Sequence, residues 1–189
     1  MRVLFIALLL ILGACQADEE TTRTVEMYNS TGDMIGTAKL SERPEGVQVK
    51  LKLEGLAPGF HGIHVHEYPE CEGPDFVSAG SHFNPDGKEH GLMHPKGAHL
   101  GDLPNIEADS GGLVKAELML AGATLKEGKK SLLKEEGTSL VIHENMDDGV
   151  SQPGGNSGAR IACGIIPKDK DAAKKTPTDP TKFNEKQKE

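Results

Sequence analysis

The chain has 189 residues with no tryptophan, 23 glycines and 11 prolines, which is enough length for one domain with a sizeable core and many turns. Residues 15–166 carry 24 acidic and 13 basic side chains, a net of −11, whereas residues 167–189 carry seven lysines against five acids. An acidic body of this kind excludes nucleic acid as the expected partner.

The first predicted element is an export signal. Met1-Arg2 precedes an unbroken apolar run from Val3 to Leu12, which is shorter than the roughly 20 residues that span a bilayer. Residues 12–15 read Leu-Gly-Ala-Cys and resemble the bacterial lipobox, in which cleavage before the cysteine accompanies its lipidation. We therefore expect a lipoprotein signal peptide over 1–14, lipid on Cys15, a flexible tether over 15–23, and attachment to the outer face of a bacterial cell membrane. The alternative is a plain secretory signal with an incidental cysteine.

Short strands joined by turns are predicted along residues 24–166. Residues 24–29 and 34–40 flank a turn, and Val47–Leu53 has the cleanest two-residue period, with every second residue apolar. Further strands are expected from Gly59 and over 105–108, 113–120, 139–143 and 159–166. Eight short strands predict an all-β sandwich or barrel. Residues 126–136 are expected to form a polar connection that can hold a helical turn, and residues 167–189 a polar, disordered tail.

Seven of the eight histidines lie between Gly59 and Asp102. His64 and His66 are two positions apart on a predicted strand, so both project from one face while Ile63 and Val65 face the core. Residues 68–101 form a loop of a length that is usually functional inside a compact domain. Histidine together with carboxylate is the ligand chemistry of copper and zinc, so a metal site is predicted on the outer side of the sheet.

Cys71 and Cys163 are the two cysteines that remain when Cys15 carries lipid. In an exported chain such a pair is usually disulfide-bonded, and free thiols are the less favoured alternative. The residues are 92 positions apart, so the chain-entropy model gives the bond roughly 4–5 kcal/mol of stabilisation.

The full histidine pattern resembles that of the copper/zinc superoxide dismutases. The sequence motifs that carry the resemblance are Gly-Ile-His-Val-His-Glu at 62–67, Ser-Ala-Gly-Ser-His-Phe-Asn-Pro at 78–85, His-Leu-Gly-Asp-Leu at 99–103 and Gly-Ala-Arg-Ile-Ala-Cys-Gly at 158–164. The resemblance spans the predicted domain, residues 24–166. It implies an eight-stranded antiparallel Greek-key β-barrel with long metal-binding and electrostatic loops. It also implies an enzyme that converts superoxide to dioxygen and hydrogen peroxide by Cu(II)/Cu(I) cycling.

The resemblance assigns a ligand set to each metal. The copper ligands would be His64, His66, His82 and His143, and the zinc ligands His82, His90, His99 and Asp102, with His82 bridging both. Four imidazoles suit Cu(II), and three imidazoles with one carboxylate suit tetrahedral zinc. Asp147 would accept hydrogen bonds from His64 and His90 and so link the two sites, with the neighbouring Asp148 as the competing choice.

Arg160 and His82 are the catalytic residues that the resemblance implies. Arg160 would dock superoxide at the copper, and His82 would take a proton when the bridge opens and deliver it to a second superoxide. His61 is expected to lie buried beneath the site and His94 to be exposed. Residues 144–159 contain no Lys or Arg, so steering of an anionic substrate is expected to depend on Arg160 and the copper ion, with help from Lys88 and Lys96.

Superoxide is thus the expected substrate, and the membrane is expected to be contacted only through the lipid on Cys15. The expected role is protection of the cell envelope from extracellular superoxide, by a monomer or a homodimer. The alternative from another class is a non-catalytic surface lipoprotein that uses the same fold to bind copper and zinc. The complete ligand set and Arg160 argue against it.

Overall fold

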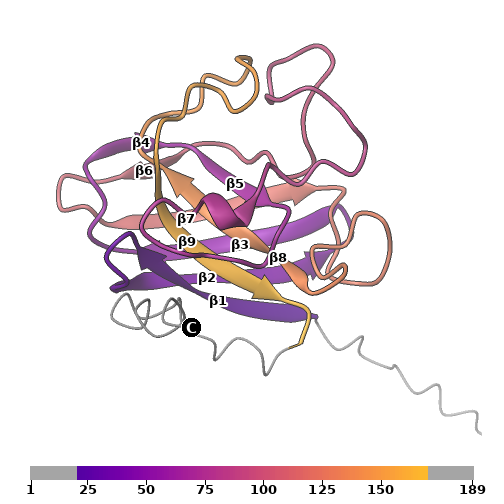
Figure 1. Ribbon diagram of the computed structural model, residues 1–189, viewed down its shortest axis with the longest axis horizontal. Coiled ribbons are helices and arrows are strands. Elements are labelled where there is room, and N and C mark those ends of the chain that lie inside the picture. Colours follow the sequence, from indigo (N-terminus) through magenta and orange to yellow (C-terminus); the bar gives the residue numbers. More distant parts are fainter. Residues whose placement is uncertain (1–20, 170–189) are drawn as a thin grey trace, which may run out of the picture.

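The computed structural model describes residues 21–169, so Cys15 and the predicted signal peptide, most of the tether, and residues 170–189 lie outside the described residues. Within the described range the fold is a seven-stranded antiparallel sheet, in the order β5-β8-β9-β1-β2-β3-β7, and a two-stranded sheet of β4 and β6 (Figure 1). The strands are β1 (Thr22–Asn29), β2 (Met34–Arg43), β3 (Gly46–Leu53), β4 (Gly59–His61), β5 (Ile63–His66), β6 (Ile106–Ala108), β7 (Val114–Ala121), β8 (Gly137–His143) and β9 (Arg160–Pro167). None of the helical structure within residues 21–169 has the length and apolar character that a membrane crossing needs.

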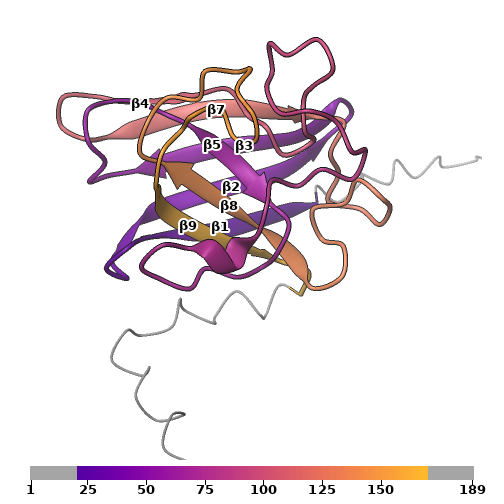
Figure 2. The same cartoon turned by 45° about the horizontal axis from the view of Figure 1, so that its top comes forward.

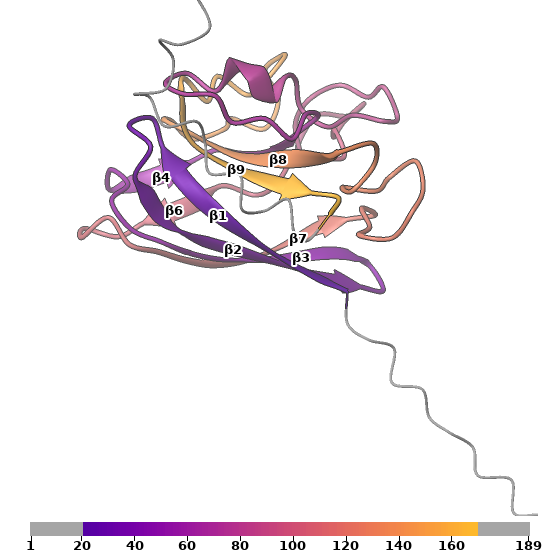
Figure 3. The same cartoon turned by 60° about the horizontal axis from the view of Figure 1, so that its bottom comes forward.

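The all-β prediction is confirmed, and the alternating pattern explains how the strands pack. On β3, Val49, Leu51 and Leu53 are buried, while Lys50 and Lys52 between them are exposed. The sheet curls so that β8 and β9 lie over β2 and β3 (Figure 3). Buried apolar side chains of β5, β8 and β9 belong to the same core cluster as those of β2, β3 and β7.

Gly62 divides the histidine-bearing strand into β4 and β5, so the eight predicted strands become nine. Its backbone N–H donates to the carbonyl of Asn145 at 2.8 Å, and its carbonyl accepts from the N–H of His143 at 2.8 Å. The chain therefore leaves its pairing with β6 and begins its pairing with β8 at this residue.

Two long loops lie side by side at one end of the molecule, residues 67–105 and residues 144–159 (Figures 1 and 2). The backbone N–H of Met93 donates to the carbonyl of Gly149 at 3.0 Å and joins them directly. The predicted disulfide between Cys71 and Cys163 is present, with a Cα–Cα distance of 5.6 Å, and it fastens the first loop to β9. A short 3-10 helix, η1 (Val77–Ala79), follows the buried Phe76 in this loop and was not predicted.

The predicted helical turn in residues 126–136 is wrong. This connection contains turns and bends and no helix. It bonds back to Thr124: the backbone N–H of Thr124 donates to the Lys130 carbonyl, and the Thr124 carbonyl accepts from the backbone N–H of Leu132. Leu132 and Leu133 are buried. Anchoring of these leucines in the core holds the connection in an irregular path despite its helix-forming composition.

Candidate metal centre

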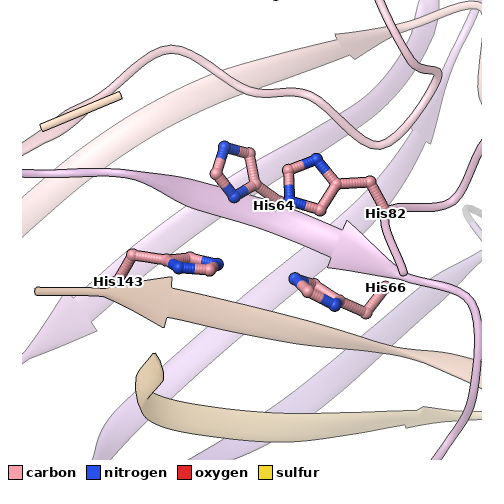
Figure 4. Close-up of side chains that lie close together, drawn as sticks. All are labelled: His64, His66, His82 and His143. Atoms are coloured by element: carbon pink, nitrogen blue, oxygen red, sulfur yellow. The ribbon is translucent and has the colours of Figure 1, made fainter. Parts of the chain in front are cut away.

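Four histidines face one another on the outer side of the sheet (Figure 4). His64 and His66 project from β5, His143 from the end of the neighbouring β8, and His82 from the loop 67–105. We call them the four-histidine set; one ring nitrogen from each lies within 4.8 Å of all the others. Ile63 and Val65, which alternate with the β5 histidines, are buried in the core.

Each of the three strand histidines has one ring nitrogen bonded to protein and one without a partner. The committed nitrogens are Nε2 of His64, 2.7 Å from Asp147 Oδ2, Nδ1 of His66, 2.9 Å from the Gly80 carbonyl, and Nδ1 of His143, 3.4 Å from the Gly158 carbonyl. The other nitrogens, Nδ1 of His64 and Nε2 of His66 and of His143, are buried and have no hydrogen-bond partner among residues 21–169. Orphaned buried polar atoms are costly, and metal-binding imidazoles have this arrangement of one bonded and one free nitrogen. The set therefore fits a copper ion, which prefers imidazole ligands.

A second group, the mixed set, consists of His82, His90, His99 and Asp102. The Nδ1 atoms of the three histidines lie 3.0, 3.2 and 3.4 Å from Asp102 Oδ1, in that order. Ligand atoms about 2.0–2.1 Å from a tetrahedral zinc ion are roughly 3.3 Å apart, so the spacing fits zinc. The other oxygen of Asp102 accepts from the backbone N–H groups of Gly91 and His99, which fixes the carboxylate.

His82 belongs to both sets. Its Nδ1 lies in the mixed set, and its ring stacks on that of His64 with 4.0 Å between the centroids. Asp147 forms a second link, because its carboxylate lies 2.7 Å from Nε2 of His64 and 3.1 Å from Nε2 of His90. Asp148 instead accepts from backbone N–H groups of Val150 and Ser151 in its own loop. The structure thus brings Asp147, rather than Asp148, to the histidines.

The electrostatics favour neutral imidazoles at His66, His82 and His143. Burial, aided by the neighbouring histidines, lowers the pKa of His66 to about 2 and that of His143 to about 3. Burial also lowers the pKa of His82 to about 4, although its bond to Asp102 opposes the shift. Neutral imidazole is the form that binds metal, so these ligands are ready for an ion at neutral pH.

The two carboxyl groups, Asp102 and Asp147, are held in their charged form. Burial alone would raise the pKa of Asp102 and of Asp147, but hydrogen bonds from the surrounding histidines outweigh it and hold both well below the usual range. Burial would likewise lower the pKa of His90, yet its bonds to these two carboxylates raise it to about 9. The mixed set is therefore anionic at Asp102, as a divalent cation requires.

Arg160 lies at the mouth of the four-histidine set. Its Nη1 donates to the Phe76 carbonyl at 2.6 Å and its Nη2 to the Gly80 carbonyl at 2.7 Å. It lines a cavity of about 350 Å³ together with three members of the set, His66, His82 and His143. Burial lowers the pKa of this guanidinium, though from a value so high that the group stays charged. Among the residues that line the cavity Arg160 is the one cation; Lys88 and Lys96 are not part of the lining.

The two remaining histidines lie outside both sets. His61 is buried, with Nδ1 2.8 Å from the His143 carbonyl and Nε2 2.8 Å from the Ala57 carbonyl, so it supports the end of β8 from beneath. His94 was expected to be exposed but is half-buried in the loop 67–105, where its Nδ1 accepts from the backbone N–H of Lys96 at 3.2 Å.

Three residues near the centre were missed by sequence reasoning. Asn105 makes two 2.8 Å bonds with the backbone of Asp147, one donated and one accepted. Gln152 does the same for the backbone of His90, at 2.8 and 2.9 Å. Gly155 has a φ of +64°, and a side chain there would overlap the Asp147 carboxylate. The only feature of the sequence that pointed to these three residues was their position close to the motifs at 99–103 and 158–164.

Comparison with known proteins identifies a matching family. Residues 34–166 match the model of the copper/zinc superoxide dismutase family. A copper/zinc superoxide dismutase of Aquifex aeolicus is 48% identical over 159 residues, which cover 83% of this chain and 93% of that protein. One of Caulobacter vibrioides is 44% identical over 138 residues, covering 71% and 79% of the two chains.

Solved structures show the same likeness. A superoxide dismutase-like protein from Bacillus subtilis superposes with a TM-score of 0.74 at 39% identity, covering 76% of this chain and 97% of that one. The copper/zinc superoxide dismutase of Brucella abortus gives a TM-score of 0.63 at 34% identity, covering 77% and 99%. Both matches span nearly all of the solved chain.

Proposed function

The chain belongs to the copper/zinc superoxide dismutase family, and on that premise we propose that the four-histidine set binds copper, that the mixed set binds zinc, and that His82 is shared by both. Members of the family are oxidoreductases that convert two superoxide anions and two protons to dioxygen and hydrogen peroxide. The observation that carries the assignment is the set of three buried, unpartnered ring nitrogens on His64, His66 and His143. They need a ligand, and the four-histidine set has the donor chemistry of copper.

The metals and the residues contribute different things. Copper, when bound, supplies one-electron transfer in both directions, and zinc supplies structure and positive charge. Arg160 supplies a fixed positive charge that attracts an anion into the cavity, since two backbone carbonyls hold its guanidinium in place. When Nε2 of His82 is not a copper ligand, that nitrogen can hold a proton for the second superoxide, because Nδ1 is committed to the mixed set.

Gly154 keeps the proton-carrying side of His82 accessible. A Cβ on this residue would lie 3.6 Å from His82 Nε2, so a larger side chain would cover that nitrogen. Gly154 also lines the cavity. Asp147 holds the rings of His64 and His90 in orientation through its two carboxylate contacts.

We also propose that the protein is exported and held to the outer face of a bacterial membrane by lipid on Cys15, where it removes superoxide that reaches the envelope. The support is the signal-like run that ends in Leu-Gly-Ala-Cys, together with the Cys71–Cys163 disulfide, a bond that persists in oxidising compartments.

The function is tested on residues 16–189, loaded with copper and zinc. We expect one ion of each per chain and rapid superoxide removal. His143→Ala should abolish activity and lower the copper content, while His94→Ala, which removes a histidine outside both sets, should change neither. Activity that survives His143→Ala would refute the assignment. Full metal binding without activity would instead support a non-catalytic metal-binding protein.

The anchor is tested separately, by fractionating cells that express the full chain. Wild-type protein should sediment with membranes and Cys15→Ser should become soluble. Membrane attachment that is unchanged in Cys15→Ser would contradict lipidation at this residue.

A further inference from the structure

Four lysines form a patch on the outer side of β2, β3 and β7, which we call the lysine face. They are Lys39 on β2, Lys50 and Lys52 on β3, and Lys115 on β7, and all are exposed. Lys39 is the register partner of Lys50, and Lys52 is the register partner of Lys115. The four charges therefore follow one diagonal across three adjacent strands.

This arrangement is unfavourable for the fold alone, because like charges directly opposite on neighbouring strands destabilise a sheet. One lysine has a local partner: Lys50 Nζ lies 3.2 Å from Glu117 Oε2. No ion pair joins Lys39, Lys52 or Lys115 to a carboxylate within the part of the chain that the structure describes. The patch stands out further because residues 15–166 have a net charge of −11.

The face is also hollowed. A depression of about 580 Å³ is lined by all four lysines, by the hydroxyl-bearing Thr24 and Thr37, by Leu51 and Ala116, and by Glu117. The carboxylate of Glu117 is paired with Lys50, so three ammonium groups in the hollow remain unpaired among the described residues. Ammonium and hydroxyl donors in one hollow suit the oxygens of a phosphate group.

The lysine face and the metal centre lie on opposite sides of the molecule. Strand β8 lies across the core from β2 and β3 (Figure 3). The exposed lysines lie on the outer side of β2, β3 and β7, whereas His64, His66 and His143 come from β5 and β8. Whatever covers the lysine face leaves the cavity at Arg160 open.

We propose that the lysine face docks on the anionic phospholipid headgroups of the membrane that carries the protein, and so points the metal cavity away from the bilayer. The proposal rests on the lipid anchor at Cys15 proposed above. The fold begins at Thr22, the register partner of Ser41, two positions along β2 from Lys39. The seven residue-to-residue steps from Cys15 to Thr22 span at most roughly 25 Å, which keeps this side of the barrel within reach of the surface. Lysines near an anionic leaflet gain electrostatic free energy within about one Debye length.

Two other occupants are disfavoured by charge. A second copy docked symmetrically on this face would place lysines against lysines. A nucleic acid would be repelled by the acidic remainder of the chain. A flat bilayer touches one side of the protein, and a tether that joins the fold at Thr22 keeps the side bearing the lysine face within reach of it.

The test uses lipid-free, metal-loaded residues 16–189 and co-sedimentation with vesicles at low ionic strength. One vesicle is phosphatidylcholine alone and the other contains phosphatidylcholine and phosphatidylglycerol in equal parts. The face variant carries Lys39→Gln, Lys50→Gln, Lys52→Gln and Lys115→Gln. The matched control carries Lys126→Gln, Lys129→Gln, Lys130→Gln and Lys134→Gln, four exposed lysines of the connection between β7 and β8, with the same change in net charge.

We expect wild type and the control to bind the anionic vesicles within twofold of each other, and the face variant at least tenfold more weakly. Binding should vanish on phosphatidylcholine and should resist competition by inorganic phosphate at matched ionic strength. Equal losses in both variants would show a general charge effect and overturn the proposal, as would displacement by phosphate or no binding by wild type. Superoxide removal by the face variant should equal that of wild type, so this outcome is separable from failure of the proposed enzyme. Cell fractionation of Cys15→Ser likewise tests the anchor without reference to the lysines.

Discussion

At the residue scale, the centre is organised by how each histidine divides its two ring nitrogens. In His64, His66 and His143 one nitrogen donates to a carboxylate or carbonyl oxygen and the other is left unpaired in a buried space. The first bond fixes both the tautomer and the orientation of the ring. The unpaired nitrogens are costly until an ion is bound, so metal binding and local stability are coupled.

Gln152 is expected to hold His90 in place for zinc. Gln152→Ala removes both bonds to the His90 backbone, so the ring becomes less fixed and zinc should leave 10–100-fold faster. Transfer of zinc to a chromogenic chelator measures this rate. Asn156→Ala is the control, since the Asn156 side chain bonds to Asp148 in the same loop. Equal zinc release from wild type and Gln152→Ala would contradict the role.

The metal-free protein should lose stability as the pH falls below about 6.5. The pKa values of His66, His143 and His82 are lowered in the folded state to about 2, 3 and 4, so the unfolded chain binds more protons between those values and 6.5. Each such histidine costs about 1.4 kcal/mol per pH unit over its window. His90 acts oppositely, because its pKa is raised to about 9 and its contribution is lost as the pH rises from 6.5 to 9.

Thermal unfolding of the metal-free chain across this pH range checks the prediction. Tm should be highest near pH 6.5 and should fall more steeply on the acid side, where three histidines act together. Metal-free His94→Ala should give the same curve. A Tm that is unchanged between about pH 7 and pH 5 would show that these imidazoles are not buried and neutral.

The sequence predicted the functional residues that lie on regular strands. It did not predict those whose side chains bond to the backbone of a distant residue. The two-residue period placed His64 and His66 on one face, because side chains alternate along a strand. Gln152 and Asn105 each bond to a residue 62 or 42 positions away in the chain, and no local pattern encodes such a pairing. The family resemblance supplied the grouping of the ligands, which spacing alone could not give.

At the element scale, the loop 67–105 is attached to β9 in two ways. The disulfide joins Cys71 to β9, and the carbonyls of Phe76 and Gly80 in the same loop hold Arg160. The position of the guanidinium therefore depends on how firmly this loop is fastened.

Removal of the disulfide should lower both stability and activity. The double variant Cys71→Ser and Cys163→Ser should lose about 2–5 kcal/mol of unfolding free energy, because the unfolded chain is no longer constrained across 92 positions. Urea unfolding measures the loss, and reduction of the wild type should reproduce it. Superoxide removal should fall while copper content at low temperature is retained, since Arg160 loses its fixed support. A loss below about 1 kcal/mol would contradict the account.

Lys52→Thr should stabilise the sheet. The substitution removes one of two like charges that face each other across β3 and β7 and places a β-branched residue on a strand. An increase of about 0.2–1 kcal/mol in unfolding free energy is expected from urea unfolding. Lys126→Thr, at an exposed loop position, should leave the free energy unchanged. A decrease for Lys52→Thr would show that the lysine contributes to the fold.

The strands themselves were predictable where one side is apolar and the other polar, as on β3. Two features were not. The break at Gly62 arises from backbone bonds to Asn145 and His143, which lie some 80 positions away. The path of residues 126–136 is set by burial of Leu132 and Leu133. The composition of this segment, which is rich in helix-forming residues, does not predict that path.

At the scale of the whole molecule, the curled sheet separates two chemically different faces. One presents the metal centre and a cavity with a single cation, and the other presents the lysine face. The acidic body between them repels superoxide, so capture depends on Arg160 and the metal charge close to the cavity. Orientation of the cavity away from an anionic bilayer would remove one further source of repulsion.

The central claim is that the two ligand sets form one centre through the imidazole of His82. It is tested most directly by electron paramagnetic resonance of protein with cobalt(II) in the mixed set and copper(II) in the four-histidine set. A shared imidazolate couples the two spins, so the copper(II) signal should be strongly attenuated relative to that of the copper–zinc protein, and His82→Ala should restore it. Independent, full-intensity copper and cobalt signals in the wild type would contradict the claim.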